Sequence, residues 1–439
     1  MDATGGNTSV PDLHVVISGA GMGGLASALA LAKQGFKRID VFETASNLGF
    51  VGAGIQLAPN MARILDRLGV WKDIEAEAVD LKETSIRTGA TDGELGNVKL
   101  GYVREQYGYP HMVGHRHSLA GSLYKGCQKE SAIKFHFSAS IADVKSFAPR
   151  PKFVVQPRNG EAYDMECDVL LAADGVKSNI RSHMLQELKI SADVKDTNQA
   201  AYRIMLKRED MENDPELLEL IEGDRVIRWI GEKRHIIAYP VSSKTIYNLS
   251  TTQPDTNFAA ATNATYTTKG SKSAMMDTFH DFCPKVKKML DLVPDGEVCE
   301  WKLRVHDPLP PRRRRLPPHP PHLAQGAAQA IEDAAVLGVV LSKLPDTQPD
   351  SIHKALKVYE EVRKERAYGL VDLAAASGRA LHLGEGAAKE ERDKAFAKLK
   401  EGKGAVPDKW ADADVQRQIY GHDCMAVAND SFDELYAKA

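Results

Sequence analysis

A glycine-rich segment near the start of the chain constrains the fold more than any other feature. Gly19–Gly24 (GAGMGG) directly follows His14–Ser18, an apolar, β-branched run that is typical of a buried parallel strand. The next residues, LASALALAKQG, have helical periodicity and end at Gly35, a predicted C-cap. A second strand is expected over Ile39–Phe42. The pattern predicts a strand, glycine loop, helix and strand within about 30 residues.

The spacing of the glycines is typical of a dinucleotide-binding loop. Gly19 would permit the tight turn, Gly21 would let the backbone approach a pyrophosphate, and Gly24 would allow close packing of helix on strand. The start of the helix would supply N–H groups for the phosphates. Glu43 follows Gly24 by 19 residues and could accept hydrogen bonds from an adenosine ribose. The alternative is a loop that only reverses the chain.

Composition excludes several classes of protein. The 57 basic and 60 acidic side chains leave a net charge of −3, so no global basic field attracts nucleic acid or anionic lipid. No apolar run is long enough for a membrane span, and the polar N-terminus lacks the apolar core of a secretory signal. The five cysteines are scattered, which argues against a disulfide framework or a structural zinc site. We expect a cytoplasmic protein with a disordered leader over residues 1–12 and no metal, membrane or nucleic-acid partner.

Two further features are candidate contacts for a cofactor. Asp174 and Gly175 follow the strand-like run Asp168–Ala172 (DVLLA). No second GxGxxG motif follows them, which argues against a pair of nucleotide-binding folds. Arg116 lies at the start of a predicted helix, where the alternative is a plain surface arginine.

With these motifs, the chain resembles the class A flavoprotein aromatic monooxygenases, and most closely their salicylate hydroxylase-like branch. The resemblance covers roughly residues 13–375, and the tail around DVQRQIYGHDC resembles fungal members. It implies that the glycine loop holds the FAD pyrophosphate and that Glu43 binds the ribose. It also implies that Arg116 reaches the FAD and that Asp174 and Gly175 contact FAD and NAD(P)H.

The resemblance implies an α/β fold: a Rossmann-like FAD-binding domain of the GR2 type, an inserted mixed β-sheet substrate domain and a helical C-terminal tail. The expected division is residues 13–187 and 300–375 for the FAD-binding domain, 188–299 for the sheet domain and 376–439 for the tail. Strand-like pieces such as AYRIMLK and HIIAYPV fall in the sheet domain, with one helix expected near Met276–Leu292.

The implied reaction uses FAD, NADPH or NADH as co-substrate, O2 and a small salicylate-like or phenolic ring. NAD(P)H reduces FAD, O2 adds at the flavin C4a position, and the distal oxygen of the hydroperoxide passes to the ring. The helix start at Gly326 and Ala327 would direct its dipole toward the N1–C2 oxygen side of the flavin. We expect a monomer or homodimer. Another flavin oxidation on the same scaffold is the alternative.

Arg203 and Tyr239 are the candidate catalytic residues on the substrate side. Arg203 lies among apolar residues of a predicted strand, where an unpaired charge is costly, and its guanidinium could bind a phenolate or carboxylate. Tyr239 could donate a hydrogen bond to the same oxygen. The alternatives are an ion pair of Arg203 across the sheet and core packing of Tyr239. Trp229 and Trp301 are interpreted as core residues, and the pair Glu332–Asp333 as a complement to a helix dipole.

One flavin motif of the family, Gly-Asp-Ala-x-His, is missing. The helix that should follow it is present as AQGAAQAIEDA, but the segment before it, Pro310–Pro321, reads PPRRRRLPPHPP. A family-like sequence, LLVGDACHPTLP, written with codons ending in C and read one base early, translates to this segment in order. We hypothesise a frame-shifted or wrongly spliced segment, with the frame restored at His322 and Arg314 at the position of the flavin-binding aspartate.

This segment leaves three interpretations of the chain open. The first is a frame-shifted or wrongly spliced translation, and the second is a genuine Pro/Arg-rich loop. In the chain as written, FAD binding is expected to be weaker because an acceptor is replaced by mutually repelling cations. The protein could then be a catalytically impaired remnant. A basic phosphate or nucleic-acid patch is the third possibility, although no aromatic residue interleaves the run.

Overall fold

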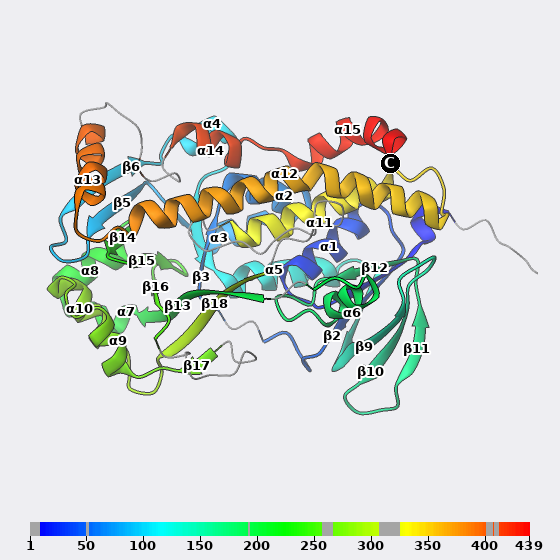
Figure 1. The fold of residues 1–439 in the computed structure, drawn as a ribbon, viewed down its shortest axis with the longest axis horizontal. Coiled ribbons are helices and arrows are strands. Elements are labelled where there is room, and N and C mark those ends of the chain that lie inside the picture. The colour runs from blue at the N-terminus through cyan, green and yellow to red at the C-terminus, as the bar shows by residue number, and fades with distance from the viewer. Residues whose placement is uncertain are drawn as a thin grey trace, which may run out of the picture.

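The computed structural model describes residues 9–49, 52–191, 194–256, 267–306, 325–400, 407 and 412–439. The expected α/β class is confirmed. Figure 1 shows a large sheet with its own helices at the left, a helix-covered parallel sheet toward the right, and the long helix α12 running across both. Residues 1–8 and 307–324 lie outside the described residues, so the Pro310–Pro321 segment does too. Val10–Asp12, the end of the expected leader, forms a short 3₁₀ helix, η1.

The predicted opening unit is confirmed. Four parallel strands form the first sheet, in the order β12 (Val169–Ala172), β1 (His14–Ser18), β2 (Arg38–Glu43) and β8 (Ile133–Phe137). All of β1 is buried, as its apolar sequence requires. The helix α1 (Met22–Lys33) follows the glycine loop, and Gly35 after it has a φ of 91°, which favours glycine at a helix end.

Two small sheets flank this core. One is antiparallel, with the strands β9 (Ala139–Ser146), β10 (Lys152–Pro157) and β11 (Tyr163–Glu166). A turn at Asn159–Gly160 joins the last two strands. The other consists of β3 (Gly54–Leu57), β7 (Met112–His115) and β4 (Val79–Asp80). Helices around these strands are α2 (Pro59–Arg67), α3 (Trp71–Glu77), α4 (Val103–Tyr107), α5 (Arg116–Gln128) and α6 (Asn179–Glu187).

The large sheet has eight strands. Their order is β17 (Thr267–Lys269), β18 (Cys299–His306), β13 (Val194–Lys207), β16 (Ile246–Pro254), β15 (Arg234–Val241), β14 (Arg225–Gly231), β5 (Glu83–Thr88) and β6 (Glu94–Lys99). It is mixed, because β14 pairs with β5 in parallel while the other pairs are antiparallel. Strands β5 and β6 come from outside residues 188–299, so the sheet is wider than the sequence indicated. The division into domains stays a prediction.

One face of the large sheet carries its own hydrophobic core. Side chains such as Tyr202, Trp229 and Tyr247 are fully buried there. The helices beside this sheet are α7 (Arg208–Met211), α8 (Pro215–Glu222), α9 (Lys272–Thr278) and α10 (Pro284–Asp291). The single helix expected near Met276–Leu292 is therefore wrong: two helices occur, because Pro284 begins a new helix at a position where its missing N–H costs nothing.

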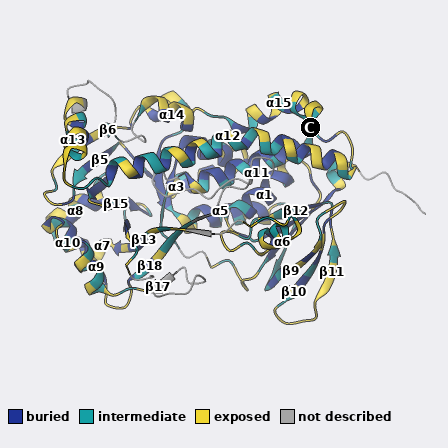
Figure 2. Ribbon diagram, in the orientation of Figure 1, coloured by how far each residue is buried: buried dark blue, intermediate teal, exposed yellow. Residues whose placement is uncertain are grey.

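Two long helices cover the parallel sheet and lead into the tail. These are α11 (Gly326–Ser342) and α12 (Pro349–Leu381), followed by α13 (Ala387–Lys400), α14 (Ala413–Tyr420) and α15 (Cys424–Lys438). α11 packs on α1 through small residues, and Figure 2 shows it as largely buried beneath α12. The tail is helical as predicted, but Cys424, Ala428 and Phe432 belong to the main core. The last helix, α15, thus packs against the main hydrophobic core.

Candidate functional site

The glycine loop is shaped by two close contacts and one opening. Gly19 has a φ of 97°, and a Cβ atom there would lie 2.5 Å from the Ala173 carbonyl oxygen. A Cβ atom on Gly24 would lie 1.9 Å from the Gly19 oxygen. These two positions therefore require glycine for the turn and for helix packing. A Cβ atom on Gly21 would meet no atom within 4 Å, so this glycine borders open space at the start of α1.

Glu43 ties the end of β2 to this loop. Its Oε2 atom accepts a hydrogen bond from the Ala20 N–H at 2.8 Å, and its Oε1 atom accepts from the Ala45 N–H at 2.9 Å. The side chain is only half-buried, so its oxygens retain acceptor capacity toward a ligand. The carboxylate thus orients the loop and borders the same open space.

Asp174 and Gly175 lie beside the loop, at the end of β12. The Asp174 Cα atom is 3.1 Å from the position of a Cβ on Gly19. Gly175 adopts a φ of 80°. The Asp174 Oδ2 atom accepts from the Ile180 N–H at 3.3 Å, whereas its buried Oδ1 atom has no donor among the residues that the structure describes. A buried acceptor without a donor next to the glycine loop indicates that a ligand completes it.

The start of α11 lies close to the start of α1. A Cβ atom on Gly23 would be 3.5 Å from the Ala330 side chain. At the first turn of α11, Gly326 is exposed and Ala327 is half-buried, while Gln325 before them is buried. The first turns of α1 and α11 therefore lie near each other, and the N–H groups of a helix start suit a ligand with negative charge.

Arg116 begins α5 and is a partly exposed residue whose guanidinium has lost part of its contact with water. Its backbone N–H donates to the Ala53 carbonyl at 3.0 Å. The pKa of its guanidinium is lowered, first by desolvation and second by the charge of Arg203. The repulsion disfavours the charged form of Arg116 unless an anion is nearby.

The two predicted substrate residues lie on one face of the large sheet. Register pairs Arg203 with Ser250 and Tyr239 with Asn248, so all four side chains project from the same face. Arg203 carries a buried Nε atom with no acceptor and forms no ion pair within the described residues. The ion pair weighed as the alternative for Arg203 is therefore absent from this part of the chain.

The electrostatics of this face favour an anion. Desolvation lowers the pKa of Arg203, and the neighbouring Tyr239 phenol opposes that effect. Burial raises the pKa of the Tyr239 hydroxyl, so it stays protonated and can donate a hydrogen bond. The Arg203 guanidinium also lies 5.5 Å from the centre of the Trp301 ring. The interpretation of Trp301 as a core residue is wrong, since its side chain is 38% exposed on this face.

Asn248 was not found by sequence reasoning. Its Oδ1 atom accepts from the Gly54 N–H at 2.6 Å, and its buried Nδ2 atom finds no acceptor within the described part of the chain. A Cβ atom on Gly54 would lie 2.6 Å from both Asn248 and the Tyr239 ring. Strand β3 therefore lies directly against the substrate face. A single asparagine in the run TIYNLSTT carries no signal that separates it from an ordinary strand residue.

The interpretation of Glu332 and Asp333 as a complement to the helix dipole is also wrong. Glu332 lies in the second turn of α11, is fully buried and bonds to Arg363 and Arg366 of α12. Asp333 accepts from the Arg363 Nε atom at 2.7 Å. Partners some 30 residues away in sequence, rather than the helix end, account for both acids.

Comparison with known proteins decides the family. The family model described as "FAD binding domain" matches residues 12–256, more than half of the chain. The chain belongs to this FAD-binding family. It is 31% identical over 366 residues to 3-hydroxybenzoate 6-hydroxylase 1 of Aquipseudomonas alcaligenes, covering 80% of this chain and 85% of that protein. It is 29% identical over 434 residues to the FAD-dependent monooxygenase OpS4 of Beauveria bassiana, covering 95% and 96%. The expected class A flavoprotein monooxygenase family is confirmed.

A solved structure shares the whole fold. The salicylate hydroxylase substrate complex superposes with a TM-score of 0.75 at 20% identity, covering 98% of this chain and 99% of that one. At this identity the likeness establishes the fold. Among the described residues, the site also fits FAD: space is open at Gly21, the Glu43 carboxylate is half-buried, and a buried Asp174 oxygen has no donor. The predicted FAD cofactor is thereby supported by geometry as well as by family.

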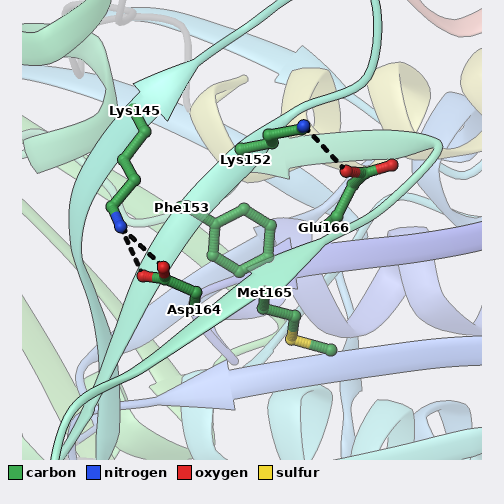
Figure 3. Close-up of a pocket in the computed structure, with 6 residues that line it drawn as sticks. All are labelled: Lys145, Lys152, Phe153, Asp164, Met165 and Glu166. Atoms are coloured by element: carbon green, nitrogen blue, oxygen red, sulfur yellow. Dashed lines mark hydrogen bonds and ion pairs between the residues drawn. The ribbon is translucent and has the colours of Figure 1, made fainter.

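A surface hollow elsewhere is a weaker candidate for a ligand site than the region around the glycine loop. It lies on the small antiparallel sheet, where Lys145 pairs with Asp164 and Lys152 with Glu166 around Phe153 (Figure 3). These charges cancel in pairs, so no side chain is left to select a ligand. Within the described ranges, no group of three His, Cys, Asp or Glu side chains could hold a metal ion. No described helix combines the length and apolar character needed to cross a bilayer.

Proposed function

We propose that this flavoprotein hydroxylates a small anionic aromatic compound, of the salicylate or phenol type, with NADPH or NADH and O2 as co-substrates. The observation that carries the proposal is the Arg203 guanidinium, whose buried Nε atom has no acceptor among the described residues and which shares a sheet face with Tyr239. The 3-hydroxybenzoate and 6-hydroxynicotinate hydroxylases among its relatives act on small aromatic acids by name, which supports this substrate class.

On the cofactor side, each predicted residue has a distinct task. Gly19 and Gly24 hold the turn, and Gly21 leaves room for the pyrophosphate. Glu43 binds the adenosine ribose. Asp174 and Gly175 contact the flavin nucleotide and the nicotinamide co-substrate. The first turn of α11, at Gly326 and Ala327, presents free N–H groups and the positive end of the helix dipole to the flavin ring.

On the substrate side, the protein contributes positive charge that binds the substrate and walls that keep water from it. Bound FAD supplies the oxidation, drawing electrons from NAD(P)H and oxygen from O2. Arg203 binds the carboxylate or phenolate oxygen, while Arg116, at the start of α5, reaches the FAD as the family resemblance implies. Tyr239 donates a hydrogen bond to the ring oxygen. The Trp301 ring and strand β3 border the aromatic ring and limit its contact with water.

The proposal is tested with the purified protein. Small aromatic acids should stimulate NAD(P)H oxidation together with O2 uptake, and isotopically labelled O2 should place one oxygen atom in the product. Neutral analogues that lack the acid should stimulate far less, because they leave the Arg203 charge unpaired. Equal stimulation by the neutral analogues would contradict the assignment. A dearomatised or merely oxidised product would support another flavin oxidation on this scaffold.

A second candidate function rests on the Pro310–Pro321 segment, which lacks the Gly-Asp of the family motif. The chain would then be a remnant with impaired FAD binding. A protein that purifies without the visible flavin spectrum, and gains none on addition of FAD, would support the remnant. A cytoplasmic location and a monomeric or homodimeric state stay predictions.

A further inference from the structure

A buried polar network joins the first turn of α11 to helix α12. Its members are Asn60, Gln325, Glu332, Arg363 and Arg366, and we call them the Glu332 network. Gln325 and Glu332 are at most 2% exposed, and Asn60 is 1% exposed. They come from three separate elements: Asn60 from α2, Gln325 and Glu332 from the start of α11, and the arginines from α12. The family resemblance assigns none of them to cofactor or substrate.

Glu332 is the centre of the network. Its Oε2 atom accepts from Arg363 Nη1 at 2.6 Å and from Arg366 Nε at 2.7 Å. Its Oε1 atom accepts from Arg366 Nη2 and Asn60 Nδ2, both at 2.7 Å. Four donors thus satisfy one buried carboxylate, and the second acid, Asp333, balances the charge of Arg363.

The network reaches the helix start through Asn60. The same Asn60 Nδ2 atom donates to the Gln325 Oε1 atom at 3.1 Å. Gln325 directly precedes Gly326, where α11 begins. Because hydrogen bonds are directional and these groups are out of water, the helix start cannot shift without leaving a buried polar group unpaired.

The network reaches the C-terminal segment, residues 412–423, through Arg366. Its Nη1 and Nη2 atoms donate to the carbonyls of Gln418 at 2.7 Å and Ile419 at 3.1 Å. The segment is well seated, since Gln416, Ile419 and Tyr420 are fully buried. One guanidinium therefore holds both Glu332 and the C-terminal segment.

We propose that the Glu332 network positions the first turn of α11 for the flavin, and that the C-terminal segment 412–423 sets this position through Arg366. The proposal rests on the FAD site of the proposed function. Asn60 and Arg366 are positioning residues in it, because they act through Gln325 and Glu332 and have no assigned contact with the cofactor.

The test compares three variants of the full chain. Asn60→Ala removes the link to Gln325, and Arg366→Lys keeps the charge but loses the fork that reaches the C-terminal carbonyls. Arg67→Ala is the matched control: Arg67 also joins α2 to this segment, through exposed bonds to Asp423 at 2.7 and 2.5 Å, but lies outside the network. Three quantities are measured for each variant. They are the FAD affinity of the apoprotein by fluorescence titration, the reduction potential of bound FAD, and amide hydrogen exchange in the first turn of α11.

We expect Asn60→Ala to weaken FAD binding at least tenfold, to make the potential more negative and to speed exchange at the first turn of α11. Arg366→Lys should act in the same direction with a smaller effect, and it decides the matter if Asn60→Ala does not fold. Arg67→Ala should leave all three readouts unchanged. Unchanged readouts in folded network variants, or equal losses in Arg67→Ala, would overturn the proposal. If the parent chain binds no FAD, the proposed function fails, and the exchange pattern alone then supports or overturns the coupling.

Discussion

Replacing Gly21 with alanine should separate cofactor binding from folding. The Gly21 backbone, at φ −72° and ψ −178°, is open to any residue, and a Cβ atom there meets no protein atom within 4 Å. Losing glycine reduces the entropy of the unfolded chain and stabilises the fold by about 0.4–1 kcal/mol. Alanine is a poorer N-cap by a similar amount. The free energy of unfolding of the apoprotein should therefore change by less than about 1 kcal/mol.

The same substitution should be costly for FAD. The new methyl group would occupy the opening through which the pyrophosphate approaches the N–H groups of α1. Loss of one hydrogen bond to a charged group costs about 1.5–3 kcal/mol. That range corresponds to an affinity for FAD that is about ten- to 150-fold lower.

Titration of the apoprotein with FAD, alongside urea unfolding, measures both quantities. Gly23→Ala is the matched control, because its methyl group would meet Ala330 at an ordinary 3.5 Å on the helix side. That variant should bind FAD like the parent chain. A folded Gly21→Ala protein with unchanged FAD affinity would refute the assignment of this loop to the pyrophosphate.

Three other outcomes are expected. Arg203→Gln should weaken binding of an anionic aromatic ligand on the order of tenfold to a hundredfold, read from the perturbed flavin spectrum, while a neutral ring analogue loses little. Burial alone would raise the pKa of Glu332, but the hydrogen bond and charge of Arg366 and the charge of Arg363 lower it from 4.5 to about 2. Because the folded pKa lies below the unfolded one, this carboxylate should contribute about 3 kcal/mol above pH 4.5 that is lost as the pH falls toward 2. If the stability of the Glu332→Gln variant falls with pH as steeply as that of the parent chain, this contribution of Glu332 is contradicted. Replacing Pro310–Pro321 by LLVGDACHPTLP should raise FAD affinity, and an in-frame transcript encoding the four arginines would sink the frame-shift hypothesis.

Local rules explain why the cofactor loop could be predicted. The apolar run of β1, the helical period of α1 and the glycine positions each depend on neighbours within a few residues. Close contacts at Gly19 and Gly24 then show the physical reason for those glycines. Arg203 and Tyr239 were expected to bind the same substrate oxygen, and the structure places both on one face of the large sheet.

Non-local partners explain what could not be predicted. Glu332 follows a helix start in the sequence, and only the packing of α12 against α11 reveals two arginines at its carboxylate. The position of Asn248 at the site depends on its hydrogen bond with Gly54, which is 194 residues away in the sequence. The added strands β5 and β6 likewise depend on pairing between distant segments.

By itself, the amino-acid sequence determined the strand, glycine loop and helix that receive a dinucleotide, because backbone freedom and hydrophobic period are encoded residue by residue. Only the tertiary structure decided which charges are paired and which remain available. Arg363 and Arg203 are both arginines in apolar surroundings, yet one is neutralised inside the core and the other is left to meet an anion. That difference arises because the cost of burying a charge depends on the groups that the fold brings beside it.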